Sequence, residues 1–208
     1  MQFTKYQFTY TGQETLPDFW KKYFVMSTEG NEYTVLVTDT PKISTKYVQE
    51  CSMEEIEPNV SINVCQSVSV EVVEDLIMCD TEYEKITQQE FYDVCSQYTN
   101  PKVLSLGYGI GLINAEMANQ NAKLTVIEKY QEVLDVNDIP EDIITVIGDV
   151  EDFDFSTLAV TETLNGVLID AGKYDVIYCD CDNPAQSYRK EELEGLLKEG
   201  GQVVYWKG

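Results

Sequence analysis

The stretch Val103-Leu104-Ser105-Leu106-Gly107-Tyr108-Gly109-Ile110-Gly111-Leu112 decides how the rest of this chain is interpreted. A short apolar run meets three glycines at alternate positions, and the helix-forming residues Ile113-Asn114-Ala115-Glu116-Met117-Ala118 follow. This order predicts a buried strand, a tight turn and the start of a helix. Glycine permits turn dihedrals closed to other residues, and it lets a ligand approach the backbone. The stretch alone fits either a nucleotide-type cradle or a turn that binds nothing, because a lone glycine motif is a weak signal.

Downstream of the glycines, apolar runs alternate with helix-like segments. We expect strands at 123–128, 143–149, 174–180 and 202–206, with helices at 131–136 and 191–197. Nearly continuous apolar strands separated by helices are typical of parallel sheets with both faces covered. The fold class predicted is therefore α/β: a Rossmann-like, doubly wound, mostly parallel sheet, shortened at its C-terminal side. The pair Asn165-Gly166 fits either a hairpin turn or a plain loop.

The N-terminal part has a different pattern. Residues 1–80 carry aromatic and β-branched residues at strand-like spacing, which predicts a small β-rich domain with an antiparallel sheet of three to five strands. Residues 81–208 form the Rossmann-like domain. It begins with a helix that starts at the capping-box spacing of Thr81 and Glu84 and places Phe91 and Cys95 on one face.

Composition and charge narrow the range of partners. Fourteen basic and 37 acidic residues give the 208-residue chain a net charge of −23, which repels nucleic acids and anionic membranes and attracts cations. Solubility is the simplest explanation of this charge; two more specific ones are a cationic substrate such as a polyamine and an acidic surface that imitates nucleic acid. The chain contains no histidine, which argues against a zinc site or a Ser-His-Asp triad, so we expect no metal. No signal peptide or membrane-spanning run is visible, so we expect a soluble, cytoplasmic protein whose six cysteines are reduced and serve packing.

Acidic residues follow three successive predicted strands. In a doubly wound sheet, ligands bind outside the carboxyl ends of the strands, where Glu128, Asp149 and Asp180 would lie beside the glycines. A carboxylate after the second strand can accept both hydroxyls of a ribose, and Asp149 can receive an adenine amino group. A nicotinamide dinucleotide fits less well, because its fingerprint needs a glycine at position 112, which is leucine here.

These residues carry a resemblance to a known superfamily. Gly107-Tyr-Gly-Ile-Gly111, Val126-Ile-Glu128, Gly148-Asp149 and Tyr174-Asp-Val-Ile-Tyr-Cys-Asp180 resemble the motifs of class I S-adenosylmethionine-dependent methyltransferases. Within that superfamily, the chain is most similar to spermidine synthases, which also place a β-rich domain before the nucleotide fold. The segment Asp180-Cys-Asp-Asn-Pro184 resembles their catalytic Asp-Ser-Thr-Asp-Pro segment, although Asn183 replaces its second aspartate and Asp182 lies beside it.

The resemblance implies a set of site residues. The cofactor, S-adenosylmethionine or its decarboxylated form, would contact Gly107, Gly109, Gly111, Glu128, Asp149 and Val150. Asp180 would bind and deprotonate an amine acceptor, with Asp182 or Asn183 orienting it. An aspartate that merely starts the next loop is the plainer interpretation of Asp180.

Three functions follow from these residues. The first is an S-adenosylmethionine-dependent transferase, most simply a methyltransferase. The second is an aminopropyltransferase of the spermidine synthase type, acting on a small cationic amine. The third is a non-catalytic acidic binding or assembly module that keeps the fold. The chain ends after its fifth predicted strand, so we also expect an open sheet edge that the N-terminal sheet, another subunit in a homo-oligomer or a partner would cover.

Overall fold

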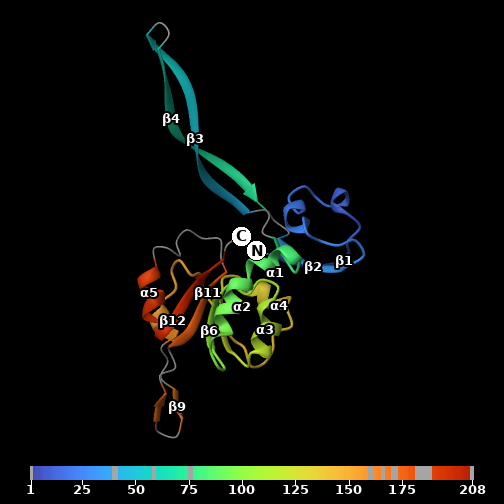
Figure 1. The fold of residues 1–208 in the computed structure, drawn as a ribbon, viewed down its shortest axis with the longest axis vertical. Coiled ribbons are helices and arrows are strands. Elements are labelled where there is room, and N and C mark those ends of the chain that lie inside the picture. The colour runs from blue at the N-terminus through green and yellow to red at the C-terminus, as the bar shows by residue number, and fades with distance from the viewer. Residues whose placement is uncertain are drawn as a thin grey trace.

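The structure is a computed structural model, and it describes residues 2–38, 42–57, 60–74, 77–158, 162–164, 167–169, 173–180 and 189–206. Its largest sheet has five parallel strands in the order β12-β11-β6-β7-β8 (Figure 1). The strands are β6 (Lys102–Leu106), β7 (Lys123–Glu128), β8 (Ile144–Ile147), β11 (Tyr174–Cys179) and β12 (Leu197–Tyr205). All five predicted strands are present, and the predicted Rossmann-like fold is confirmed.

Neighbouring residues along the central strands enter two separate cores, one on each face of the sheet. Leu104 and Ile177 belong to one core, and Val103 and Tyr178 belong to the other. The core that contains Leu104 and Ile177 is covered by η3 (Phe155–Leu158) and α5 (Lys190–Gly195). The core that contains Val103 and Tyr178 is covered by α2 (Gln89–Cys95), α3 (Ile113–Asn119) and α4 (Gln131–Asp135). The sheet is therefore covered on both faces, as its apolar strands predict.

The two outer strands of the sheet differ in length and cover. On β8, Ile144 and Ile147 are exposed at 61% and 45%. At the other side, β12 has β11 as its only neighbour in the described sheet. The Tyr98 hydroxyl donates to the carbonyl of Gly200 at 2.8 Å, so the segment after α2 reaches this strand. The expected open edge is thus β12 in the part of the chain that the structure describes.

The N-terminal part forms a three-stranded antiparallel sheet in the order β1-β2-β5. Its strands are β1 (Phe3–Thr9), β2 (Glu32–Thr38) and β5 (Ile77–Cys79), and the turns η1 (Gln13–Thr15) and η2 (Lys21–Phe24) lie between the first two. Phe24 is fully buried between the rings of Tyr10 and Tyr33. Phe3 and Leu36 join the core of the larger sheet, so the two parts share apolar packing.

A long two-stranded ribbon separates from this small sheet. Strands β3 (Lys42–Glu57) and β4 (Val60–Glu74) pair with each other in antiparallel register and stand away from both sheets (Figure 1). The predicted small antiparallel sheet of three to five strands is confirmed by the three-stranded sheet β1-β2-β5, but two of the predicted strand segments lie outside it. The strand-like spacing of Ser61–Val64 and Ser67–Val73 is real, but these residues belong to one continuous strand outside the sheet.

Three local predictions have mixed outcomes. The helix expected after Thr81 is split into α1 (Glu82–Thr87) and α2. The Thr81 side chain makes no capping hydrogen bond; its hydroxyl pairs with the Cys79 sulfur at 3.6 Å. Strands β9 (Glu162–Leu164) and β10 (Val167–Ile169) pair in antiparallel register, and Asn165 and Gly166, for which a hairpin turn or a loop was expected, lie outside the described residues. Among the described residues, no helix is long and apolar enough to cross a membrane.

Candidate functional site

The glycine turn joins β6 to α3, and all three of its glycines have positive φ angles, of 107°, 59° and 76°. A Cβ added at Gly107 would lie 2.7 Å from the carbonyl oxygen of Asp180, so the ends of β6 and β11 approach at backbone distance. A Cβ at Gly111 would meet the Tyr108 hydroxyl at 2.9 Å. Packing of the turn therefore accounts for Gly107 and Gly111 without any ligand. A Cβ at Gly109 would make only an ordinary contact, 3.7 Å from the sulfur of Met78.

Glu128 ends β7 and holds the glycine turn in place. Its side chain is only 4% exposed, and one carboxylate oxygen accepts the N–H of Tyr108 at 3.0 Å. The other oxygen accepts the N–H of Tyr130 at 2.9 Å. A carboxylate oxygen has two lone pairs, so each can accept one further bond. The predicted ribose-binding residue is thus beside the glycines, and it already organises the loops on both sides of it.

Asp149 follows β8 and lies next to Lys129, which follows β7. One Asp149 oxygen is 2.5 Å from the Lys129 ammonium, and the other accepts the N–H of Glu151 at 3.1 Å. This hydrogen bond to Asp149 raises the pKa of Lys129. Both side chains are partly exposed, so the pair is screened by water and contributes little to stability. A ligand amino group that binds Asp149 would therefore compete with Lys129.

Asp180 directly follows β11. Burial raises the pKa of Asp180 to about 7, and the nearby carboxylates of Glu84 and Glu128 raise it further. A hydrogen bond from the Tyr178 hydroxyl has the opposite effect and lowers this pKa. The Tyr178 hydroxyl donates to Asp180 at 3.4 Å, and its ring stacks on Phe91 at 4.2 Å. Near pH 7 this carboxyl therefore exchanges a proton readily, as a general base must. The other two predicted catalytic residues, Asp182 and Asn183, lie outside the described residues.

Glu84 joins this group from α1, and sequence analysis missed it. Burial raises the pKa of Glu84, while a bond from the Thr87 hydroxyl lowers it. The indole N–H of Trp206 donates to that same hydroxyl at 3.0 Å, which ties the end of β12 to α1. No sequence signal indicates Glu84, because only the packing of α1 over the sheet brings it near Asp180.

Arg189 was also missed, and it fixes the segment that carries Asp149 and Val150. Its guanidinium donates to the carbonyls of Val150 at 2.6 Å and Phe153 at 2.7 Å, and it lies 4.4 Å from the centre of the Phe155 ring. The peptide group that joins Val150 to Glu151 is therefore held on both sides: Arg189 donates to its carbonyl oxygen, and its N–H donates to the Asp149 carboxylate. Arg189 sets the orientation of the loop from which Asp149 projects.

Changing Arg189 to lysine should loosen this loop. A lysine ammonium cannot reproduce the planar fork that reaches two carbonyls, so we expect the free energy of unfolding to fall by about 1–3 kcal/mol. Amide hydrogen exchange should accelerate across 149–155. Lys190→Ala is the matched control, since Lys190 makes only an exposed pair with Glu194 and should change stability by less than about 0.5 kcal/mol. Equal exchange in both variants would show that Arg189 does not hold the loop.

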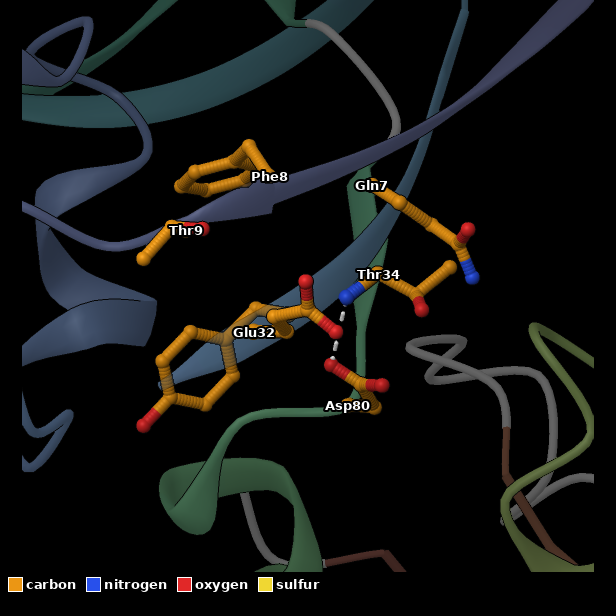
Figure 2. Close-up of a pocket in the computed structure, with 7 residues that line it drawn as sticks. Gln7, Phe8, Thr9, Glu32, Thr34 and Asp80 are labelled. Atoms are coloured by element: carbon orange, nitrogen blue, oxygen red, sulfur yellow. Dashed lines mark hydrogen bonds between the residues drawn. The ribbon is translucent and has the colours of Figure 1, made fainter. Parts of the chain in front are cut away.

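A separate hollow of about 390 Å³ lies on the N-terminal sheet and does not include any predicted site residue. Figure 2 shows the Thr34 N–H donating to Asp80, a bond of 2.7 Å that occupies one carboxylate oxygen on the hollow's wall. The hollow is lined by Gln7, Phe8, Thr9, Glu32, Tyr33, Thr34 and Asp80. Its polar lining differs from the largely apolar lining typical of small-molecule pockets, so we assign no ligand to it.

The fold and the acidic carboxyl edge of its sheet define a Rossmann-like α/β protein. No protein-family model and no curated protein matches the chain. Among solved structures, it is similar to the CcbJ methyltransferase from Streptomyces caelestis, with 16% identity and a TM-score of 0.43 over 59% of this chain and 48% of that one.

Two further solved structures are similar to this chain. One is precorrin 8w decarboxylase from Methanobacterium thermoautotrophicum, with 12% identity, a TM-score of 0.45 and coverage of 58% of this chain and 61% of that one. The other is an S-adenosylmethionine-dependent methyltransferase from Mesorhizobium loti, with 14% identity, a TM-score of 0.39 and coverage of 57% and 52%. The chain thus spans about half the length of the solved chains that it matches.

Proposed function

We propose that this chain is an S-adenosylmethionine-dependent transferase, and that it moves a methyl group to an acceptor carrying an amine. One observation carries the proposal: the buried carboxylate of Glu128, the residue expected to bind ribose, accepts the N–H of Tyr108 in the glycine turn. This hydrogen bond fixes the carboxylate and the turn next to each other. Glu128 and Asp149 follow neighbouring strands, and Asp180 follows β11 beside β6. In open α/β sheets, this carboxyl edge is where ligands bind.

The residues at this edge fit an adenosine group in their donor and acceptor types. Glu128 retains one lone pair on each oxygen for a ribose hydroxyl, and its two backbone bonds fix the carboxylate in advance. The Tyr108 side chain is 3% exposed and packs into the core of the larger sheet. Asp149 would accept an adenine amino group once Lys129 yields one of its contacts.

The chemistry required of the protein is small. S-adenosylmethionine supplies a methyl group on a sulfonium, which is already a good leaving group. The protein must align the acceptor nitrogen and remove its proton. Asp180, with its pKa raised to about 7, suits that task at neutral pH. The net charge of −23 attracts a cationic amine toward the site.

Calorimetry on the full chain tests the proposal. We expect S-adenosylmethionine and S-adenosylhomocysteine to bind, and Asp149→Ala to weaken binding by about 1–3 kcal/mol, because it leaves a buried ligand donor unpaired. Asp152→Ala is the matched control, since this exposed acid lies on the same loop and should bind as the parent does. Silence with both ligands would overturn the cofactor assignment.

The same titration separates the two other functions. Preference for decarboxylated S-adenosylmethionine over the intact cofactor would favour aminopropyl transfer to a diamine. Silence with all three ligands would favour a binding or assembly module, in which Glu128 and Asp149 serve only the backbone N–H groups and Lys129 that they contact now.

A further inference from the structure

Asn137, two residues after α4, contacts three separate parts of the molecule through its side-chain amide. Its Nδ2 donates to the carbonyl of Gly109 in the glycine turn at 3.0 Å and to the carbonyl of Val133 in α4 at 2.7 Å. Its Oδ1 accepts a hydrogen bond from the ammonium of Lys5 on β1 at 3.2 Å. Nothing in the sequence marks Asn137, because asparagine is an ordinary residue of loops. The fold alone places it between the N-terminal sheet and the glycine turn.

These three partners fix the orientation of the amide. An asparagine side chain has two N–H donors on its nitrogen and a carbonyl oxygen that only accepts. With the nitrogen facing two carbonyls and the oxygen facing an ammonium, every contact pairs a donor with an acceptor. Exchanging the positions of the nitrogen and the oxygen would set oxygen against oxygen and nitrogen against nitrogen. A single orientation of the Asn137 amide therefore satisfies Gly109, Val133 and Lys5 together.

The first peptide group of the glycine turn is held on both of its sides. The Ser105 hydroxyl donates to the carbonyl of Gly107 at 2.8 Å, and the N–H of Tyr108 donates to Glu128 at 3.0 Å. A trans peptide directs its C=O and N–H to opposite sides, so these two bonds define the plane of the peptide between Gly107 and Tyr108. This part of the turn is fixed by the protein itself.

The peptide group between Gly109 and Ile110 is held differently. Asn137 holds its carbonyl, whereas the Ile110 N–H donates to none of the residues that the structure describes. Gly109 has a φ of 59°, a region that glycine enters without strain, so the backbone here has little intrinsic preference of its own. By fixing the carbonyl, Asn137 also sets the direction of the Ile110 N–H, which retains its capacity to donate to a ligand.

The N-terminal sheet contacts the loops of the candidate site at two further points. Phe3 on β1 places its ring centre 5.5 Å from that of Tyr130, whose N–H donates to Glu128. Met78 on β5 lies beside Gly109, since a Cβ on that glycine would be 3.7 Å from the methionine sulfur. The sheet thus reaches both the glycine turn and the loop after β7, and Glu128 joins these two segments.

We propose that Asn137 is a positioning residue for the cofactor: it fixes the peptide between Gly109 and Ile110, and the N-terminal sheet, through Lys5, orients its amide. This inference rests on the proposed function, because it concerns the affinity of the same site for S-adenosylmethionine. Without Asn137 the peptide is free to rotate, and binding must then order it at a cost in affinity. The N-terminal sheet thereby takes part in cofactor binding as well as in packing.

Calorimetry of Asn137→Asp with S-adenosylmethionine tests the first step. The carboxylate keeps an acceptor for Lys5 but has no donor for the carbonyls of Gly109 and Val133, so we expect Kd to rise about 10-fold. Asn119→Asp makes the same change of charge on an exposed amide at the end of α3 and should bind as the parent does. If the parent binds and Asn137→Asp binds equally well, or both variants weaken equally, this inference falls while the proposed function stands. A parent that binds nothing overturns both.

Substitutions of Lys5 test the link to the N-terminal sheet without altering the amide or the glycine turn. Lys5→Met removes the donor to Asn137, so we expect Kd to rise about 3-fold, whereas the urea midpoint of unfolding stays that of the parent because position 5 is exposed. Lys5→Arg supplies another donor and should bind as the parent does. Lys21→Met is the charge-matched control, since this lysine pairs with Asp18 on the surface. Parent-like affinity of Lys5→Met, or equal loss in Lys21→Met, would overturn the role of Lys5.

Discussion

Replacing Glu128 with alanine should lower the free energy of unfolding by about 3–5 kcal/mol, because hydrogen bonds to a charged group are worth about 1.5–3 kcal/mol each. The substitution leaves the N–H groups of Tyr108 and Tyr130 without their acceptor at a position that is 4% exposed. A small domain has a total stability of about 5–15 kcal/mol, so the loss is a large share of it. Urea unfolding at neutral pH measures the change.

Two companions make the Glu128 measurement specific. Glu128→Gln keeps one carbonyl acceptor and replaces the other oxygen with a donor, so it should cost about half as much as alanine. Glu141→Ala removes an exposed acid and should change stability by less than about 0.5 kcal/mol. If Glu128→Ala and Glu141→Ala unfold at the same urea concentration, the carboxylate does not support the glycine turn.

The sequence predicts the larger sheet well, because its three inner strands, β6, β7 and β11, are runs of mostly apolar residues that are buried on both faces. Positions 103–106 and 174–179 are almost entirely buried, and such runs have few alternatives in a chain of this length. The helix after Thr81 is predicted only in part: Phe91 and Cys95 give one apolar face, but nothing in the pattern marks the break between α1 and α2 at Gln88.

The ribbon could not be predicted from the same signals. Alternation at Ser61–Val64 and Ser67–Val73 indicates a strand with one apolar face, and a small sheet is the usual way to bury such a face. Gln66 interrupts the apolar positions and makes one long strand resemble two short ones. Only the register with β3 shows that the strand is continuous and belongs to no larger sheet.

At the candidate site, the sequence predicts which acids lie at strand ends but not what holds them. Glu128 ends β7, and Asp149 and Asp180 follow β8 and β11, as their positions after apolar runs imply. Their neighbours Lys129, Arg189 and Glu84 come from loops or from α1, and no local pattern marks them. Contacts between segments far apart in sequence decide their roles, so only the folded arrangement shows them.

Replacing Asp180 with asparagine should stabilise the protein at alkaline pH. Its folded-state pKa of about 7 lies above the ordinary value of 3.8, so the folded state binds more protons than the unfolded state between these values. Stability from this group is therefore present at low pH and lost as pH rises from about 4 to 7. Because one pKa unit corresponds to about 1.4 kcal/mol, we expect Asp180→Asn to gain about 2–4 kcal/mol at pH 8.

The pH dependence of that gain identifies its cause. At about pH 4 the Asp180 carboxyl is protonated in the folded state, so the parent and Asp180→Asn should unfold at nearly the same urea concentration. Asp152→Asn is the control, since this exposed acid should show no gain at either pH. A gain of equal size at both values would mean that asparagine improves packing and that the charge on Asp180 is not destabilising.

The stability and the activity of Asp180→Asn should change in opposite directions. A buried carboxylate that weakens the fold near neutral pH needs a compensating use, and catalytic groups commonly trade stability for function in this way. If Asp180 takes the acceptor's proton, the asparagine variant should bind S-adenosylmethionine as the parent does and lose turnover by at least about 100-fold. A more stable variant with undiminished turnover would separate the raised pKa of Asp180 from catalysis and remove this residue from the proposed mechanism.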